Sequence, residues 1–266
     1  MAQKKFRVLP GFGLTMGFTL FYLSAIVLIP FAGLVLRTLE LSWADLWRLA
    51  TTDRALAAYR VTFGASLVAA VANAAFGTLL AWVLVRYDFP GRRFIDAIVD
   101  FPFALPTAVA GLTLANLFAA NGWLGRYLVP LGIKGAFTPL AVVIALTFVG
   151  MPFVVRTLQP AIGSIPTSLR QAAAVLGASP GRVWREIDLP LLRRAALVGA
   201  VFAFTISLGE FGATTMLARP DMPTLPVAIA GFLGQPGALN YGQAMAMATI
   251  LMLTCAVGVL VIEEAV

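Results

Sequence analysis

One carboxylate lies by itself inside an apolar stretch of this sequence. Glu210 is the only charged residue of the run 195–218. A charge at membrane depth costs roughly 2.5–3.5 kcal/mol on insertion scales, so the side chain needs a partner, water or a proton. Two roles are open: a hydrogen bond to backbone N–H groups of a neighbouring helix, or a position at a gate. Gly209 and Gly212 on either side of it permit close approach of another helix.

A pair of prolines marks a second candidate site. Pro102 and Pro106 open another apolar run and precede Thr107. Each proline removes a helix hydrogen bond. Broken helices at membrane depth are tolerated where they line a cavity or are buried in protein, and free N–H groups beside Thr107 are suited to facing an anion. The segment is therefore either a structural kink or part of a translocation path.

The residue types needed for catalysis are almost absent. The sequence has no histidine and a single cysteine, Cys255, which excludes clustered Cys/His metal sites and a histidine-activated nucleophile. It has no G-x4-G-K-[S/T] phosphate loop, so it does not bind ATP through that motif. No basic face interleaved with aromatic residues indicates nucleic-acid binding. We expect no catalytic residue, no metal and no cofactor in this chain.

Composition indicates a membrane protein. The 266 residues are 60% hydrophobic and 12% charged, with a mean hydropathy of +0.91, against about 45–50% apolar and about 25% charged residues in soluble domains. A spanning helix needs about 20 apolar residues, and the alternation of a β-barrel is missing. We predict an all-α polytopic fold, a single transmembrane domain over 1–266 with about six spans. The predicted spans are 11–36, 61–85, 98–119, 137–158, 195–218 and 243–262.

The distribution of charge predicts the topology. Most Lys and Arg residues fall on one side if both termini are cytoplasmic, as the positive-inside rule requires. The outer loop 37–60 carries Trp43 and Trp47 and is expected to form an amphipathic helix at the interface. At the inner end of the third span, we expect Asp96 and Asp100 to pair with Arg92 or Arg93.

The longest cytoplasmic loop, 164–190, has the features of a folded segment. Ser164 is a candidate cap for a helix that has Pro166 in its first turn and ends at Gly177. Ser179 and the proline after it start a second short helix. The loop is thus predicted to be a helix–turn–helix. These features alone leave open whether it docks another protein or only packs on its own bundle.

This loop resembles the EAA loop of ABC-importer permeases, whose pattern is E-A-A-x3-G-x9-I-x-L-P. Six of the seven fixed positions match at the right spacing, and Gln171 stands where the family usually has Glu. An amide keeps the shape and hydrogen-bonding reach of that side chain but not its charge. The resemblance implies that the loop docks in a groove of a separate ATPase and transmits its closure. The coupling residues so implied are Gln171, Ala172, Ala173, Gly177, Ile187, Leu189 and Pro190.

The resemblance extends over most of the chain. Segments between residues 59 and 156, among them Ala81-Trp-Val-Leu-Val-Arg86 and the segment from Phe101 to Gly111, are similar to the T-type permease of sulfate/thiosulfate importers. The stretch 217–226 is more similar to thiamine or ferric-iron permeases. The resemblance implies the type I permease fold, like that of molybdate and maltose importers, in the bacterial inner membrane. It leaves molybdate, thiamine and ferric iron as alternative substrates.

The same resemblance implies the partners. They are a dimer of the ATPase, which holds ATP and Mg²⁺, a periplasmic substrate-binding protein, and a second permease subunit. That second subunit is either a different W-type chain or a second copy of this one. The alternative from another class is a secondary transporter that works alone; it predicts internal repeats, and none is visible.

Overall fold

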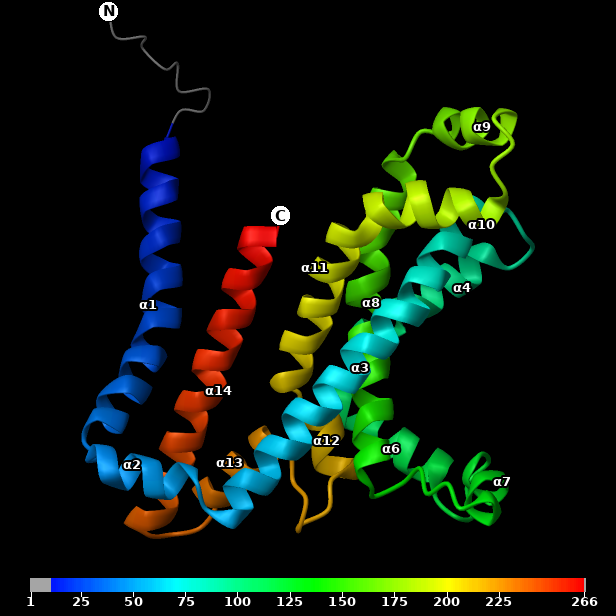
Figure 1. Ribbon diagram of the computed structural model, residues 1–266. Helices are drawn as coiled ribbons and strands as arrows, with labels where there is room; N and C mark the ends of the chain where they lie inside the picture. The colour runs from blue at the N-terminus through cyan, green and yellow to red at the C-terminus, as the bar shows by residue number, and fades with distance from the viewer. Residues whose placement is uncertain (1–10, 266) are drawn as a thin grey trace, which may run out of the picture.

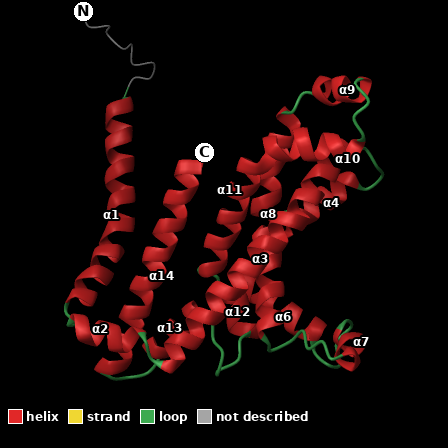
Figure 2. Cartoon of the chain, in the orientation of Figure 1, coloured by secondary structure: helices red, strands yellow, loops and turns green. Residues whose placement is uncertain are grey.

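The computed structural model describes residues 11–265, and these residues form a bundle of helices with no β-strand (Figures 1 and 2). The predicted all-α fold is confirmed. Five helical stretches are long and apolar enough to cross a membrane: α1 (Phe12–Leu39), α3 (Asp53–Arg86), α8 (Pro139–Ser164), the continuous stretch Pro180–Leu208, and α14 (Ala238–Ala265).

The stretch Pro180–Leu208 has three parts. They are α10 (Pro180–Val183), the π-helical turn η2 (Trp184–Asp188) and α11 (Leu189–Leu208). The shorter helices are α2 (Trp43–Ala50), α4 (Arg92–Val99), α5 (Phe101–Ala104), α6 (Thr107–Phe118), α7 (Gly125–Leu128), the 3-10 turn η1 (Val129–Leu131), α9 (Thr167–Val175), α12 (Gly212–Leu217) and α13 (Leu225–Leu233).

Two of the predicted spans are not continuous helices. The segment 98–119 contains the end of α4, then α5 and α6, and α6 has only 12 residues. Leu105, which precedes Pro106, is extended at φ −100° and ψ 136°, because a residue before proline is pushed out of the helical region. The segment 195–218 is interrupted between Leu208 and Gly212 without a proline.

The outer loop 37–60 is also not one amphipathic helix. The first residues of this loop belong to the end of α1, and its last residues belong to the start of α3. Only α2 is therefore a separate helix of the loop. The Ser42 side chain caps α2 by accepting a hydrogen bond from the Asp45 N–H at 3.1 Å. Trp43 and Trp47 are exposed, while Leu49 and Ala50 at the other end of α2 are buried. The amphipathic character is therefore confined to about two turns.

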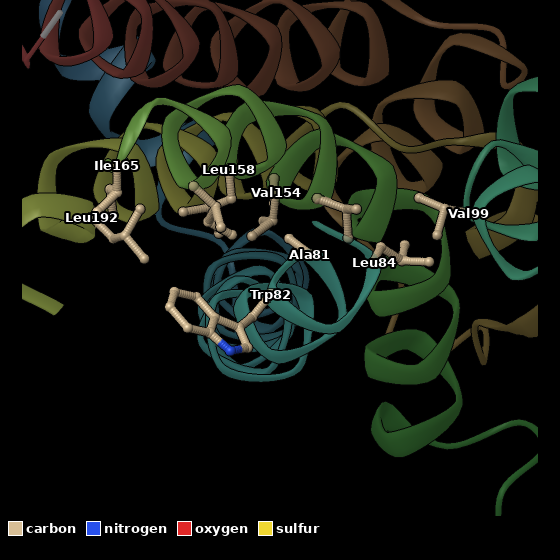
Figure 3. Packing of buried hydrophobic residues seen from close by; sticks show 11 residues of the cluster. Ala81, Trp82, Leu84, Val99, Val154, Leu158, Ile165 and Leu192 are labelled. Carbon is tan, nitrogen blue, oxygen red and sulfur yellow. The ribbon is translucent and has the colours of Figure 1, made fainter. Parts of the chain in front are cut away.

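The core lies where α3, α8 and α11 cross. Buried side chains from these helices, including Trp82, Val154 and Leu192, form its largest cluster (Figure 3). Small residues bring the helices close together. A Cβ atom on Gly77 of α3 would lie 2.9 Å from Val154, and one on Gly150 of α8 would lie 2.6 Å from the Asn73 amide. Such close approach is how membrane helices gain van der Waals packing without a hydrophobic driving force.

An arginine on α8 holds the broken third segment in place. The Arg156 guanidinium donates hydrogen bonds to the Asp100 carboxylate at 2.6 and 2.8 Å and to the Asp96 carboxylate at 2.7 Å. The Gln159 amide adds a bond to Asp96 at 2.9 Å. The expectation that Asp96 and Asp100 pair with Arg92 or Arg93 is therefore wrong. Arg156 is distant in sequence, but α8 carries it alongside α4 and α5.

We predict that Arg156→Gln destabilises the protein by about 1–3 kcal/mol, because two carboxylates lose charged hydrogen bonds. Thermal unfolding in detergent measures this loss.

The pKa of Asp96 is held below its ordinary value by the Gln159 hydrogen bond and then by Arg156. The pKa of Asp96 is therefore lower in the folded than in the unfolded protein. The stabilisation is fully present at pH values above the ordinary aspartate pKa of about 4, and it is lost as the pH falls through the pKa of the folded state.

The matched control is Arg92→Gln, since Arg92 pairs with the exposed Asp88 on the same side of the bundle. An exposed pair contributes about 0–1 kcal/mol, so this variant should melt close to the wild type. Equal losses for the two variants would contradict the structural role given to Arg156.

Candidate coupling loop and translocation path

The loop between α8 and α11 begins one residue later than expected. α8 continues through Ser164, whose hydroxyl donates to the Ala161 carbonyl at 2.8 Å. Ser164 is therefore the last residue of α8, and the expectation that it caps the next helix is wrong. Ile165 is extended because Pro166 follows it. Pro166 then precedes the first turn of α9.

Gly177 ends α9 as the sequence predicts. It has φ +81°, a left-handed conformation that favours glycine. The Ala178 N–H donates to the Ala173 carbonyl at 2.9 Å, and the Gly177 N–H donates to the Ala174 carbonyl at 3.0 Å. These two bonds are the Schellman arrangement, which satisfies carbonyls at a helix end. The chain therefore reverses at a defined geometry and not through a flexible linker.

The second helix of the loop also begins where expected. The Ser179 hydroxyl accepts a hydrogen bond from the Arg182 N–H at 3.4 Å, and Pro180 follows in the first turn of α10. α10 passes through η2 into α11 without a break. The predicted helix–turn–helix is confirmed, and its second helix is continuous with a long apolar helix of the bundle.

The coupling residues expected from the EAA-type pattern lie mostly on the surface of this loop. Gln171, Ala172, Gly177, Leu189 and Pro190 are exposed, and Ala173 and Ile187 are half-buried. α9 has no buried residue and lies at the far end of the bundle, away from α2 and α13 (Figure 1). This arrangement leaves the outer side of α9 free to meet another protein.

Two residues that the pattern does not include add to this surface. Val175 and Leu176 are 88% and 86% exposed at the end of α9, directly before Gly177. Large apolar side chains gathered on an exposed tip indicate a contact site more than a solvated loop. In the sequence they lie between Ala172 and Ala173 of the EAA-type pattern and Gly177, and this position is the signal that could have identified them.

The residues of the expected path come together where two broken helices meet. A Cβ atom on Gly111 of α6 would lie 2.6 Å from the Ala213 Cα atom, and one on Gly212 would collide with the Thr107 hydroxyl. The first turns of α6 and α12 therefore touch through their backbones. Pro106 precedes α6, and Pro102 lies in the first turn of α5. Thr107 and Glu210 are thus brought to the same region, from segments about a hundred residues apart.

Glu210 caps the helix that follows it. Its side chain is buried, with the residue 8% exposed, and its carboxylate accepts a hydrogen bond from the Ala213 N–H at 2.8 Å. The Thr214 hydroxyl donates to the Glu210 carbonyl at 2.7 Å. The bond is made within the same segment, to the first turn of α12, and not to a neighbouring helix as one of the two expected roles required. Gly209, on the other side of the break, is exposed.

No group of three or more His, Cys, Asp or Glu side chains within the part of the chain that the structure describes is arranged to hold a metal ion.

Comparison with known proteins places these features in one family. Residues 73–265 match the family described as "Binding-protein-dependent transport system inner membrane component". The sulfate transport system permease protein CysT of Salmonella typhimurium is 45% identical over 218 residues, which cover 82% of this chain and 79% of that protein. CysT of Escherichia coli is 45% identical over 212 residues, covering 80% and 76%. CysT of Synechococcus elongatus is 44% identical over 200 residues, covering 75% and 72%.

Solved structures show the same fold. A bacterial alginate ABC transporter, crystallised in complex with a periplasmic protein bound to an alginate pentasaccharide, contains a chain that superposes with a TM-score of 0.76 at 19% identity, covering 95% of this chain and 92% of that one. A second alginate-importer structure gives 0.71 at 18% identity, covering 96% and 94%. The chain belongs to the family of binding-protein-dependent transport system inner membrane components, and it is a multi-pass permease subunit of an ABC transporter, not its ATPase.

Proposed function

We propose that this chain moves sulfate or thiosulfate across the inner membrane as the permease of an ATP-driven importer. The observation that carries the proposal is the 45% identity to sulfate permeases over about four fifths of the chain. Molybdate, thiamine and ferric iron are less favoured substrates, since the relatives reported above are named for sulfate. Family membership likewise disfavours a secondary transporter that works alone.

The partners follow from the same proposal. A dimer of a separate ATPase, which holds ATP and Mg²⁺, docks on α9, and a periplasmic protein delivers the anion. A second permease subunit, either a W-type chain or another copy, completes the path. ATP-driven closure of the ATPase would draw the loops of the two permeases together and switch the bundle between inward- and outward-facing states.

The arrangement of the helices supports the proposed orientation. The first residues of α1 and the last residues of α14 lie at the same end of the bundle as α9 and α10, whereas α2, α7 and α13 lie at the opposite end (Figure 1). If the ATPase docks on α9 from the cytoplasm, both ends of the described chain face the cytoplasm as well. This agrees with the excess of Lys and Arg residues assigned to that side.

The α6–α12 contact is the candidate lining of the path. Thr107 presents a hydroxyl at the first turn of α6, and the break before α12 is capped by Glu210. The carboxylate repels an anion, so its proposed role is to hold α12 in place at a gate. The Thr107 hydroxyl and the free N–H groups of α6 are the groups suited to a passing oxyanion.

Sulfate transport is tested by uptake. Expressed with its ATPase, binding protein and second permease in cells that lack sulfate uptake, the chain should restore growth on sulfate and uptake of radiolabelled sulfate. Excess thiosulfate should compete with the label. Competition by molybdate, with no effect of thiosulfate, would assign the importer to molybdate instead, and failure of rescue by the intact set of subunits would reject the sulfate assignment.

Docking of the ATPase is tested at Gly177. In Gly177→Val a β-branched residue would have to adopt the left-handed conformation, at a cost of about 1–2 kcal/mol, so we expect about ten-fold less ATPase to co-purify with the tagged chain. The matched control is Gly163→Val, since Gly163 lies in the last turn of α8 with nothing within 4 Å of an added Cβ. Equal retention of the ATPase by both variants would place its docking site elsewhere.

The path is tested by labelling at Thr107. In a Cys255→Ala background, we expect Thr107→Cys to react with a water-soluble thiol reagent, at a rate that ATP and the binding protein change in the assembled transporter. Ala115→Cys is the control. Ala115 lies on α6, is buried against residues of α8 and α12, and should stay unreactive. Absence of labelling at Thr107→Cys in every transport state would remove this segment from the path.

A further inference from the structure

A buried carboxylate lies where the coupling loop enters the bundle. Asp188 is the last residue of η2, the π turn between α10 and α11, and its side chain is 0% exposed. A charge removed from water in this way costs several kcal/mol unless it is paired. π turns of this kind occur often at functional sites. The charges that compensate Asp188 are therefore informative about the role of this turn.

An arginine of α9 pairs with this carboxylate. The Nε atom of Arg170 lies 3.4 Å from an Asp188 carboxylate oxygen, without the geometry of a hydrogen bond. A second arginine, Arg86, is the last residue of α3. Its guanidinium donates to the carbonyls of Ile162 and Ile165 at 2.8 and 3.1 Å, which lie at the end of α8 and just after it. One arginine thus joins α9 to the turn before α11, and the other joins the end of α3 to the end of α8.

Two tryptophans complete the cluster. The Arg170 guanidinium carbon lies 4.9 Å from the centre of the Trp82 ring, and that of Arg86 lies 5.4 Å from it. Trp184, the first residue of η2, meets Trp82 edge to face with ring centres 4.7 Å apart. Trp82 itself belongs to the main core of the bundle (Figure 3). Cation–π contacts contribute about 0.5–1 kcal/mol at exposed sites and about 2 kcal/mol when desolvated, and the Arg170 side chain is 35% exposed. α9 is thus held to the core through charge and aromatic packing together.

α9 has little else to hold it. None of its residues is buried, and its C-terminal side chains Val175 and Leu176 are almost fully exposed. Arg170 is half-buried and is the α9 side chain with both an ion pair and an aromatic contact to the bundle. Among the residues of α9, Arg170 is therefore the candidate for carrying a force from the exposed face of α9 to the bundle.

We propose that the Arg170–Asp188 pair, backed by Arg86, Trp82 and Trp184, is the rigid link that passes movement of α9 to α3 and α11. Arg170 and Asp188 are then positioning residues for the transport cycle. The proposal rests on the proposed function, in which an ATPase moves α9. It also gives a role to Trp82 and Arg86, which belong to a segment shared with sulfate-type permeases but lie outside the EAA-type pattern.

The test removes the charges as a pair. Single replacements leave one buried charge without its partner and risk misfolding, so the informative variant is Arg170→Gln together with Asp188→Asn, which keeps both shapes. The control is Arg37→Gln with Glu40→Gln, an exposed ion pair of 3.1 Å in and just after α1. All variants carry Cys255→Ala, so that spin labels can be attached at chosen cysteines.

The first measurement needs no knowledge of the substrate. Spin labels at Val175→Cys on α9 and Phe76→Cys on α3, both exposed positions, report the distance between the loop and the bundle. We expect one narrow distance distribution in the parent and in the control, and a broad one in the neutral double variant.

The second measurement is sulfate carried per ATP hydrolysed by the complete transporter in proteoliposomes. We expect this ratio to fall about five-fold or more in the double variant, with the ATPase still co-purifying.

The outcomes separate the two proposals. A narrow distance distribution and an unchanged ratio of sulfate to ATP in the double variant would overturn the proposed link. A lower melting temperature with the distance distribution and the ratio unchanged would also overturn it, because that is the result expected of a pair that only stabilises the fold. Asp188→Glu, which retains the charge, should keep most of the parent's ratio. If the complete parent transporter does not move sulfate, the proposed function fails, and the distance measurement still decides whether the link exists.

Discussion

The backbone of a membrane helix has no water to bond, so each place where a helix stops must replace the lost hydrogen bonds locally. This constraint explains the residues on which the structure depends most. Where α12 begins after the break at Leu208, the Glu210 carboxylate accepts a hydrogen bond from the Ala213 N–H. Where α8 ends, the Arg86 guanidinium donates to the carbonyls of Ile162 and Ile165. At these two places a charged side chain supplies the hydrogen bond that the helix end lacks.

Short helices that begin inside the bundle can also pack closely against one another. α6 and α12 touch through Gly111, Ala213 and Gly212, where no side chain fits between the two backbones. Such a contact is close enough to be altered by a small shift of either helix, because protein interiors are densely packed and do not deform gradually. The broken segments thus meet in a tight contact beside the main core, which lies where α3, α8 and α11 cross.

Much of this architecture is predictable from the sequence, and the exceptions have physical causes. Runs without charge predict α1, α3, α8 and α14, and Gly177 and Ser179 predict the turn of the loop, because these signals are local. The break at Gly209–Phe211 has no proline and depends on the Glu210 cap, whereas the apolar residues on both sides of Glu210 predict one continuous span. The partner of Asp96 and Asp100 is Arg156 and not the nearby Arg92, because that pairing is made by the packing of α8 and not by distance along the chain.

Asp188 shows the same limit and its consequence for mechanism. In sequence it is one acidic residue of a charged loop, but folding buries it beside Arg170. Removing one partner of a buried ion pair costs about 3–5 kcal/mol, whereas moving a two-state equilibrium from 1:99 to 99:1 takes about 5.5 kcal/mol. The pair alone is weaker than such a shift, so the proposed link also needs the contacts of Arg170 with Trp82 and of Trp82 with Trp184. An exposed pair, worth about 0–1 kcal/mol, would separate first, so a loop that transmits force requires its charges to be buried.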